Sequence, residues 1–135
     1  MDKFLLRMGK FKPMQGRILI VDDNTDLSEI MSIILHAEGF EVKTCDSLDF
    51  CEGDIQVWNP DLLVLDVNVN GEDGRIFCSK QKSISDLKII LMSGDETTLD
   101  HTHWYGADDC IAKPFDSADL LQKIHFCLEA STKNT

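Results

Sequence analysis

The stretch Leu62-Leu63-Val64-Leu65-Asp66 decides the fold, because four consecutive apolar residues end at a single carboxylate. A short, unbroken apolar run is typical of a strand that is buried on both faces of a parallel sheet. An ionised aspartate is costly to bury without a partner, so other polar groups must lie near Asp66. We therefore expect Asp66 at the carboxyl end of this strand, in the crevice where open parallel sheets bind ligands.

Three more apolar runs end in polar or charged residues and would present them at the same edge of the sheet. These runs lie at residues 18–23, 89–93 and 110–115. Together with the first stretch they offer three carboxylates, one hydroxyl and one ammonium, which belong to Asp22, Asp23, Asp66, Ser93 and Lys113. Such a set suits a divalent cation and a phosphoryl group.

Strand and helix patterns alternate along the whole chain. Strand patterns occupy residues 17–21, 40–45, 62–66, 88–92 and 110–112, and helical patterns occupy residues 25–38, 47–57, 75–82 and 96–105 and begin again at Asp116-Ser117. Gly53 is expected to interrupt the second helix, and residues 68–74 are expected to form a polar loop. Five β-α repeats with right-handed crossovers predict an α/β fold, a doubly wound five-stranded parallel sheet with helices on both faces.

The length of 135 residues suffices for one domain with its own core. We assign residues 1–16 to a basic flexible leader, residues 17–131 to the folded domain and residues 132–135 to a tail. The net charge of -11 is uneven, because residues 1–17 hold five Lys or Arg against one Asp. The acidic remainder argues against direct binding of nucleic acid, which needs a basic face.

The cysteines and the hydropathy pattern bear on the compartment. The five cysteines are scattered and contain no C-x-x-C pair, which indicates free thiols rather than a zinc site. No apolar run approaches the roughly 20 residues needed to span a bilayer, and no signal peptide is recognisable. These features predict a cytoplasmic protein without a membrane span.

Several motifs, taken in order, resemble the receiver domain of two-component response regulators. They are Val21-Asp22-Asp23-Asn24, the apolar strand that ends at Asp66, Asp73-Gly74, Ser93-Gly94, and Gly106-Ala107-Asp108-Asp109 leading into Lys113-Pro114-Phe115-Asp116. The resemblance covers about residues 17 to 131. It implies the flavodoxin-like receiver fold with strand order 2-1-3-4-5.

The resemblance implies the chemistry of phosphorylation. Asp66 corresponds to the aspartate that takes a phosphoryl group from a phosphohistidine, so the partner would be a sensor histidine kinase or a histidine phosphotransfer protein. Ser93 matches the hydroxyl residue that contacts the phosphoryl group after activation. Lys113 matches the invariant lysine of the family, and the peptide bond to Pro114 is commonly cis there.

The resemblance also implies a Mg²⁺ site at the acidic residues. Asp23 would bind the ion directly, together with Asp66 and the backbone carbonyl of Asn68, and Asp22 would hold a metal-bound water. The residue types agree, since Mg²⁺ accepts carboxylates, a carbonyl and waters. Without a cation the neighbouring carboxylates would repel one another and raise their pKa values. A competing interpretation is that Asp22 or Asp23 caps the helix that follows.

Two residues depart from the family pattern. Asn70 stands where the family usually has proline, which we expect to loosen the loop after Asp66. Cys110 stands at the switch position, where the family usually has Tyr or Phe. A thiol cannot report activation by swinging a large ring, so we expect the signal to leave through the loop and helix after Ser93, with Trp104 or Tyr105 supplying the surface change. Redox sensing by Cys110 is the rival interpretation.

The function expected from these observations is a phosphorylation-dependent signalling switch that catalyses only its own phosphorylation and dephosphorylation. It would act in phosphorelay signal transduction and signal to a downstream protein that the sequence does not identify. Two alternatives stay open: a receiver module taken from a longer regulator or hybrid kinase, and an interaction module that works without phosphorylation. A flavin or dinucleotide domain is disfavoured because no G-x-G-x-x-G follows the first strand.

Overall fold

The computed structural model describes residues 16–101 and 105–133. Five parallel strands form its central sheet in the order β2-β1-β3-β6-β7. Their bounds are β1 (Arg17–Val21), β2 (Glu41–Cys45), β3 (Leu62–Asp66), β6 (Lys88–Ser93) and β7 (Asp109–Ala112). Because β6 and β7 are the fourth and fifth strands of this sheet, the order 2-1-3-4-5 is confirmed. Of the expected leader (residues 1–16), only Gly16 is described, and its carbonyl accepts the Glu41 amide. Of the expected tail (residues 132–135), the first two residues belong to α5, and residues 134–135 lie outside the described residues.

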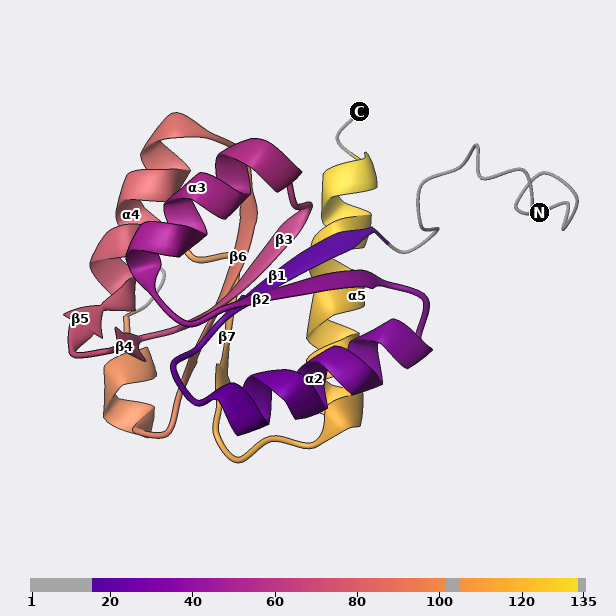
Figure 1. Ribbon diagram of the computed structural model, residues 1–135, viewed down its shortest axis with the longest axis horizontal. Helices are drawn as coiled ribbons and strands as arrows, with labels where there is room; N and C mark the ends of the chain where they lie inside the picture. Colours follow the sequence, from indigo (N-terminus) through magenta and orange to yellow (C-terminus); the bar gives the residue numbers. More distant parts are fainter. Residues whose placement is uncertain (1–15, 102–104, 134–135) are drawn as a thin grey trace, which may run out of the picture.

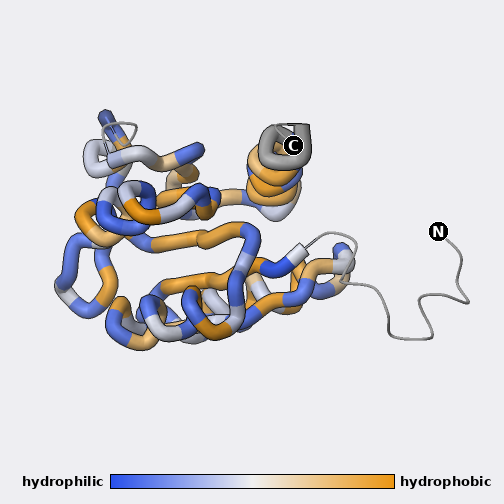
Figure 2. The backbone as a smooth tube through the Cα atoms, turned by 90° about the horizontal axis from the view of Figure 1, so that it is seen from above, coloured by the Kyte–Doolittle hydropathy of each residue, from blue (hydrophilic) through white to orange (hydrophobic). Residues whose placement is uncertain are grey.

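Helices cover both faces of the sheet (Figure 1). On one face α2 (Thr25–Ala37) and α5 (Ser117–Lys133) pack against alternate residues of β1, such as Ile18 and Ile20. On the other face α3 (Leu48–Trp58) and α4 (Gly74–Ile84) pack against Leu19 and Val21. Every residue of β3 is buried, as its unbroken apolar run predicts. Figure 2 shows the hydrophobic colour running along the inner strands and the hydrophilic colour in the turns.

The helices begin at side-chain caps. Ser47 caps α3 and Asp116 caps α5, where the Asp116 Oδ1 accepts the Asp119 amide at 2.7 Å. The cap of α2 is Asn24, whose Oδ1 accepts the Leu27 amide at 3.1 Å. The alternative in which Asp22 or Asp23 caps α2 is therefore wrong. The expected interruption of α3 at Gly53 is also wrong, since one glycine costs a helix interior only about 1 kcal/mol.

The expected polar loop at residues 68–74 contains a small antiparallel ribbon. Its strands are β4 (Asn68–Val69) and β5 (Glu72–Asp73), joined by Asn70 and Gly71. Both turn residues have positive φ, 53° and 83°, which is the geometry of a two-residue hairpin with an Asn-Gly turn. The ribbon fixes the segment that immediately follows Asp66.

The fourth helix, expected at residues 96–105, is not the predicted α-helix where the structure describes it. A short 3₁₀ helix, η1 (Glu96–Leu99), follows the Asp95 cap. Asp100 is extended and His101 has a φ of 64°, so the helix ends there. The hydroxyls of Thr97 and Thr98 bond to Asp95, and such local bonds compete with a regular helix. Residues 102–104, including Trp104, lie outside the described residues.

Two further observations concern the expectations on thiols and membranes. All five cysteines are free thiols, and four of them are buried. Burial raises the pKa of Cys78 to about 12 and that of Cys127 to about 11. Within residues 16–101 and 105–133, none of the helices combines the length and the apolar character that crossing a membrane requires.

Candidate functional site

The register of the parallel strands brings four polar side chains to one edge of the sheet. Asp22 directly follows β1, Asp66 ends β3, Ser93 ends β6 and Lys113 directly follows β7. The strands are aligned so that Val21 pairs with Leu65, Asp66 with Met92, and Ser93 with Ala112. Residues that lie 91 positions apart in the sequence therefore meet at the carboxyl ends of the strands.

Lys113 joins the two buried carboxylates of this edge. Its Nζ donates to Asp22 Oδ2 at 2.7 Å and also to Asp66 Oδ2. Only 1% of Asp22 and 7% of Asp66 is exposed, so both carboxylates need a positive partner. The Lys113–Pro114 peptide bond is cis, as the family resemblance implied. The three side chains form a compact charged cluster, which we call the acid pocket.

Burial and pairing act in opposite directions on the acid pocket. Burial raises the pKa of Asp22, and the hydrogen bonds from Lys113 and from the Asn24 amide offset this only in part. Burial opposes the charge of Lys113, but its hydrogen bonds to Asp22 and Asp66 outweigh this and raise its pKa above the usual value. The ammonium therefore stays charged at neutral pH, and its single positive charge offsets one of the two carboxylate charges.

A stability consequence follows from the raised pKa of Asp22. The unfolded chain releases this proton near pH 3.8 and the folded protein releases it at a higher pH. Between the two values the contribution of Asp22 to stability falls as the pH rises. Without Mg²⁺, the free energy of unfolding of Asp22→Asn minus that of the parent protein should therefore rise from pH 3 to pH 7. Chemical denaturation of both proteins at both pH values measures this difference, and a fall in the difference would contradict the expectation.

Backbone contacts also fix the position of the Asp66 carboxylate. The Asn68 amide donates to Asp66 Oδ1 at 2.9 Å. The first residue of α4 is Gly74, and a Cβ placed there would lie 2.1 Å from the Asp66 carbonyl oxygen. Only glycine allows so close an approach. Helix α4 therefore starts directly against the backbone that carries Asp66.

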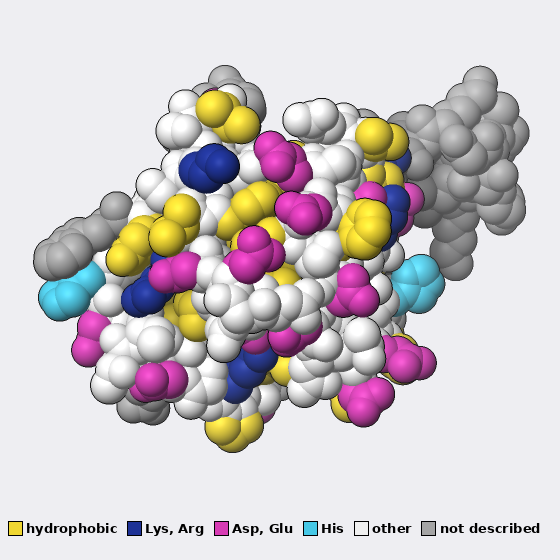
Figure 3. Space-filling view, turned by 60° about the vertical axis from the view of Figure 1, so that its left-hand side comes forward, with side chains coloured by type: hydrophobic (Ala, Val, Ile, Leu, Met, Phe, Trp, Pro, Cys, Tyr) yellow, Lys and Arg dark blue, Asp and Glu magenta, His cyan; other side chains and the backbone are white. Residues whose placement is uncertain are grey.

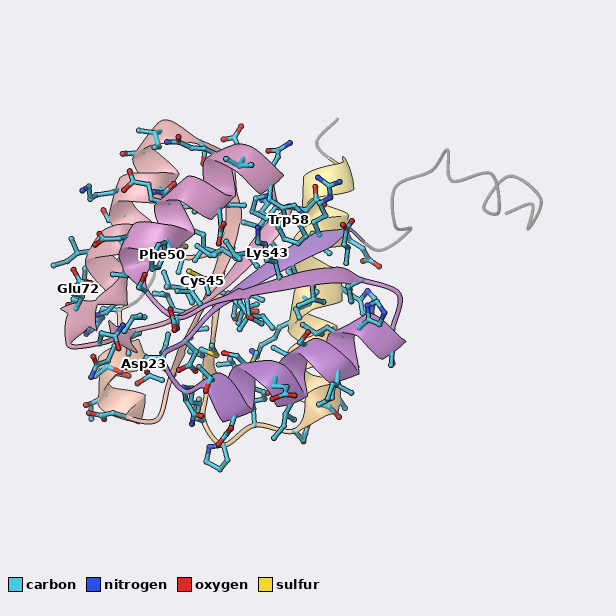
Figure 4. The ribbon with its side chains drawn as sticks, in the orientation of Figure 1. Asp23, Lys43, Cys45, Phe50, Trp58 and Glu72 are labelled. Carbon is cyan, nitrogen blue, oxygen red and sulfur yellow. The ribbon has the colours of Figure 1, made fainter. Side chains whose placement is uncertain are left out.

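Asp23 lies just beyond the end of β1 (Figure 4). It is exposed, in contrast to Asp22. Its Oδ2 accepts the backbone amide of Asn70 at 2.9 Å, and the Asn70 side chain donates to the Asp46 carbonyl at 2.8 Å. Proline could not make the first of these bonds, because it has no amide hydrogen. The expectation that Asn70 loosens the loop is therefore wrong: Asn70 ties the ribbon to the ends of β1 and β2.

The donor set suits Mg²⁺ chemically. In the described part of the chain, no three acidic, histidine or cysteine side chains already surround one point as a complete ligand set would. Mg²⁺ does not require this, since it keeps several waters and binds proteins through one or two carboxylates. Asn68 lies opposite Asp73 in the ribbon, and its amide points out of the ribbon to Asp66. This hydrogen bond holds the Asn68 backbone next to the Asp66 carboxylate.

A cleft of about 360 Å³ opens beside the acid pocket. Asp22, Thr25, Thr44 and Asp46 are among the residues that line it, from β1, α2 and the end of β2. The space-filling view shows acidic side chains spread over the face that carries α3 and α4, with fewer basic ones (Figure 3). This excess of negative charge favours cations over anions near the face.

The hydrogen bonds of the Ser93 hydroxyl are to the loop that follows β6, not to Asp22, Asp66 or Lys113. The hydroxyl forms hydrogen bonds with Asp95 and Thr98 in the loop that follows β6. The predicted switch position, Cys110, is half-buried and packs against the core on the face of α3 and α4. Tyr105 lies beneath the Arg75 guanidinium, 5.4 Å from the ring centre. The sequence reasoning did not single out Thr98, or the contact that makes Gly74 necessary.

Comparison with known proteins identifies the family of this chain. The family model described as response regulator receiver domain matches residues 18–125. The DNA-binding response regulator MtrA of Mycolicibacterium paratuberculosis is 31% identical over 113 residues, which are 82% of this chain and 50% of that protein. The chain thus spans about half the length of such relatives.

Solved structures agree as well. A CheY-like response regulator receiver domain protein from Methanospirillum hungatei is 30% identical, with a TM-score of 0.80 over 88% of this chain and 98% of that one. NtrX from Brucella abortus is also 30% identical, with a TM-score of 0.82 over 90% of this chain and 28% of that one.

Proposed function

The chain belongs to the response regulator receiver domain family, and from this premise we propose that Asp66 accepts a phosphoryl group from a phosphohistidine. Receiver domains of two-component regulators are signalling switches rather than classical enzymes. The observation that carries the proposal is the Lys113 ammonium, which contacts both Asp22 and Asp66 at the carboxyl edge of the sheet. A buried carboxylate held beside a fixed cation is the arrangement that a phosphoryl acceptor needs.

The reaction is a transfer of one phosphoryl group. A carboxylate oxygen of Asp66 attacks phosphorus, the P–N bond to the donor imidazole breaks, and the imidazole takes up a proton. The product is an acyl phosphate on Asp66. Lys113 then lies beside the new phosphoryl oxygens, and Ser93 at the end of the neighbouring strand supplies a hydroxyl once it turns inward. Hydrolysis of the acyl phosphate by water resets the switch. Asn68 and Asp95 lie two residues beyond Asp66 and Ser93, and we infer that they orient the attacking water.

We assign the cation site to Asp23, Asp66 and the Asn68 carbonyl, with Asp22 acting through a bound water. When bound, Mg²⁺ neutralises the phosphoryl oxygens during transfer. Asn70 uses only Oδ2 of Asp23, which leaves Oδ1 to face a cation. We include Asp66 and the Asn68 carbonyl in the same site because the Asn68 amide donates to Asp66 Oδ1 and keeps the two residues adjacent.

Mg²⁺ should raise the melting temperature, because it binds the folded state preferentially. At a concentration 100 times the Kd the stabilisation is about 2.7 kcal/mol. Asp23→Asn should lose most of this shift. Asp46→Asn is the matched control, since it removes the same charge from an exposed neighbour that is outside the ligand set. Thermal unfolding at a series of Mg²⁺ concentrations tests this, and equal Mg²⁺ affinity of Asp23→Asn and the parent would require a different site.

The partners follow from the same chemistry. A phosphohistidine donor implies a sensor histidine kinase or a histidine phosphotransfer protein, and a downstream protein would recognise the phosphorylated face. The acidic surface of the domain does not favour direct contact with nucleic acid. The function is tested by incubation of the protein with Mg²⁺ and acetyl phosphate, followed by intact mass measurement. One added phosphoryl group that depends on Mg²⁺ supports the proposal, and an unchanged mass opposes it.

A further inference from the structure

The hydroxyl of Ser93 is held by the loop that follows its strand. Ser93 Oγ accepts the Asp95 amide at 3.0 Å and donates to the Asp95 carbonyl at 3.1 Å. Thr98 Oγ1 lies 2.6 Å from Ser93 Oγ and 2.7 Å from the same carbonyl. Two hydroxyl protons are thus shared among three short contacts between two hydroxyls and one carbonyl, and we call this group the clasp. Its members are Ser93, Asp95 and Thr98.

The clasp connects the strand end to η1. Asp95 caps this helix, and its side chain accepts the amide and the hydroxyl of Thr97 at 3.0 Å and 2.7 Å. These two bonds lower the pKa of Asp95. Thr98 belongs to the helix itself, so its hydroxyl links η1 to Ser93 directly. Any rotation of the Ser93 hydroxyl toward Asp66 must break the bond to Thr98.

We propose that Thr98 is a positioning residue that holds the Ser93 hydroxyl in the resting conformation and releases η1 when Ser93 turns to a phosphoryl group on Asp66. This inference rests on the proposed roles of Asp66 and Ser93. A contact that exists only in the resting state favours that state. Thr98 therefore contributes to the free energy that activation requires, and η1 moves when its bond to Ser93 breaks.

The clasp also accounts for signalling without a ring at position 110. Cys110 packs in the same core cluster as Leu99, the last residue of η1. A thiol is small and adapts to its neighbours, so it offers no pair of alternative positions. The link from Ser93 through Thr98 needs no such side chain, because the two hydroxyls are already in contact. Movement of η1 then changes the surface next to Leu99.

The test compares three variants in their Mg²⁺-dependent binding of beryllofluoride, a phosphoryl mimic that requires no transfer reaction. Thr98→Val keeps the shape and removes the hydroxyl, so it should bind beryllofluoride about 2 to 10 times more tightly, as expected for one lost resting-state hydrogen bond. Thr98→Ser restores the hydroxyl and should bind like the parent protein. Thr97→Val is the matched control, because the Thr97 hydroxyl contacts Asp95 and not Ser93.

A double-mutant cycle separates the clasp from a general effect on the loop. In a Ser93→Ala background, Thr98→Val should no longer change the affinity for beryllofluoride. Amide chemical shifts of residues 94–99 should move in unliganded Thr98→Val toward their positions in the beryllofluoride complex. Equal affinity of Thr98→Val and the parent, or the same gain without the Ser93 hydroxyl, overturns the clasp alone. A parent protein that does not bind beryllofluoride with Mg²⁺ overturns the proposed function and the clasp together.

Discussion

Asp66→Asn is expected to abolish Mg²⁺-dependent phosphorylation completely. The amide is nearly isosteric with the carboxylate but is not a nucleophile that can form an acyl phosphate. The fold should persist, because the side-chain oxygen of the substituted residue can still accept the Asn68 amide, as Asp66 Oδ1 does in the parent protein. Intact mass after incubation with acetyl phosphate measures the loss, and thermal unfolding confirms that the variant is folded.

The control for this variant removes a carboxylate elsewhere. Asp86 is exposed and precedes β6, so it lies at the amino end of the strands, opposite the acid pocket. Asp86→Asn should be phosphorylated like the parent protein. A phosphoryl group that persists on Asp66→Asn, mapped to another residue, would remove Asp66 from its proposed role.

Gly74→Ala should produce the largest loss of stability. Its Cβ would lie 2.1 Å from the carbonyl oxygen of Asp66 and 3.2 Å from the Cα of Val67. Both neighbours are backbone atoms, so no side chain can rotate away. Overpacking costs about 1–3 kcal/mol where side chains can adjust, and we expect about 3 kcal/mol or more here. Phosphorylation should slow as well, because the strand end that carries Asp66 must shift.

Gly53→Ala provides the matched control for Gly74→Ala. No atom lies within 4 Å of a Cβ at this position, and Gly53 is in the middle of α3. The substitution should raise the free energy of unfolding by about 0.5–1 kcal/mol, since alanine favours a helix interior. Chemical denaturation of both variants measures the difference. Similar stabilities would show that the contact at Gly74 is less tight than the structure indicates.

The sheet was predictable because each of its strands can be recognised from a few neighbouring residues in the sequence. Each strand is a short apolar run, and a polar residue at its end marks the carboxyl edge, as Asp66 does for β3. Parallel pairing of the strands then suffices to place their carboxyl ends, which are distant in the sequence, at one edge of the sheet. The contact of Lys113 with Asp22 and Asp66 is a consequence of this alignment.

The features that sequence reasoning missed depend on single contacts. The ribbon after Asp66 has strands of only two residues, so no periodicity could reveal it, although Asn70-Gly71 is a turn signal. The helix expected after β6 shortens to η1 because threonine hydroxyls bond locally. Thr98 carries no motif, and only the distance of its hydroxyl to Ser93 shows that it belongs to the site.

The most direct test of the account is to locate the phosphoryl group within the chain. The protein is incubated with Mg²⁺ and acetyl phosphate, the acyl phosphate is reduced with borohydride, and the modified residue is identified by peptide mass spectrometry. Reduction converts a phosphorylated aspartate to homoserine and leaves an unmodified one unchanged. We predict homoserine at position 66, only when both Mg²⁺ and the donor are present. Homoserine at another aspartate, or at none, would contradict the assignment of Asp66 as the acceptor.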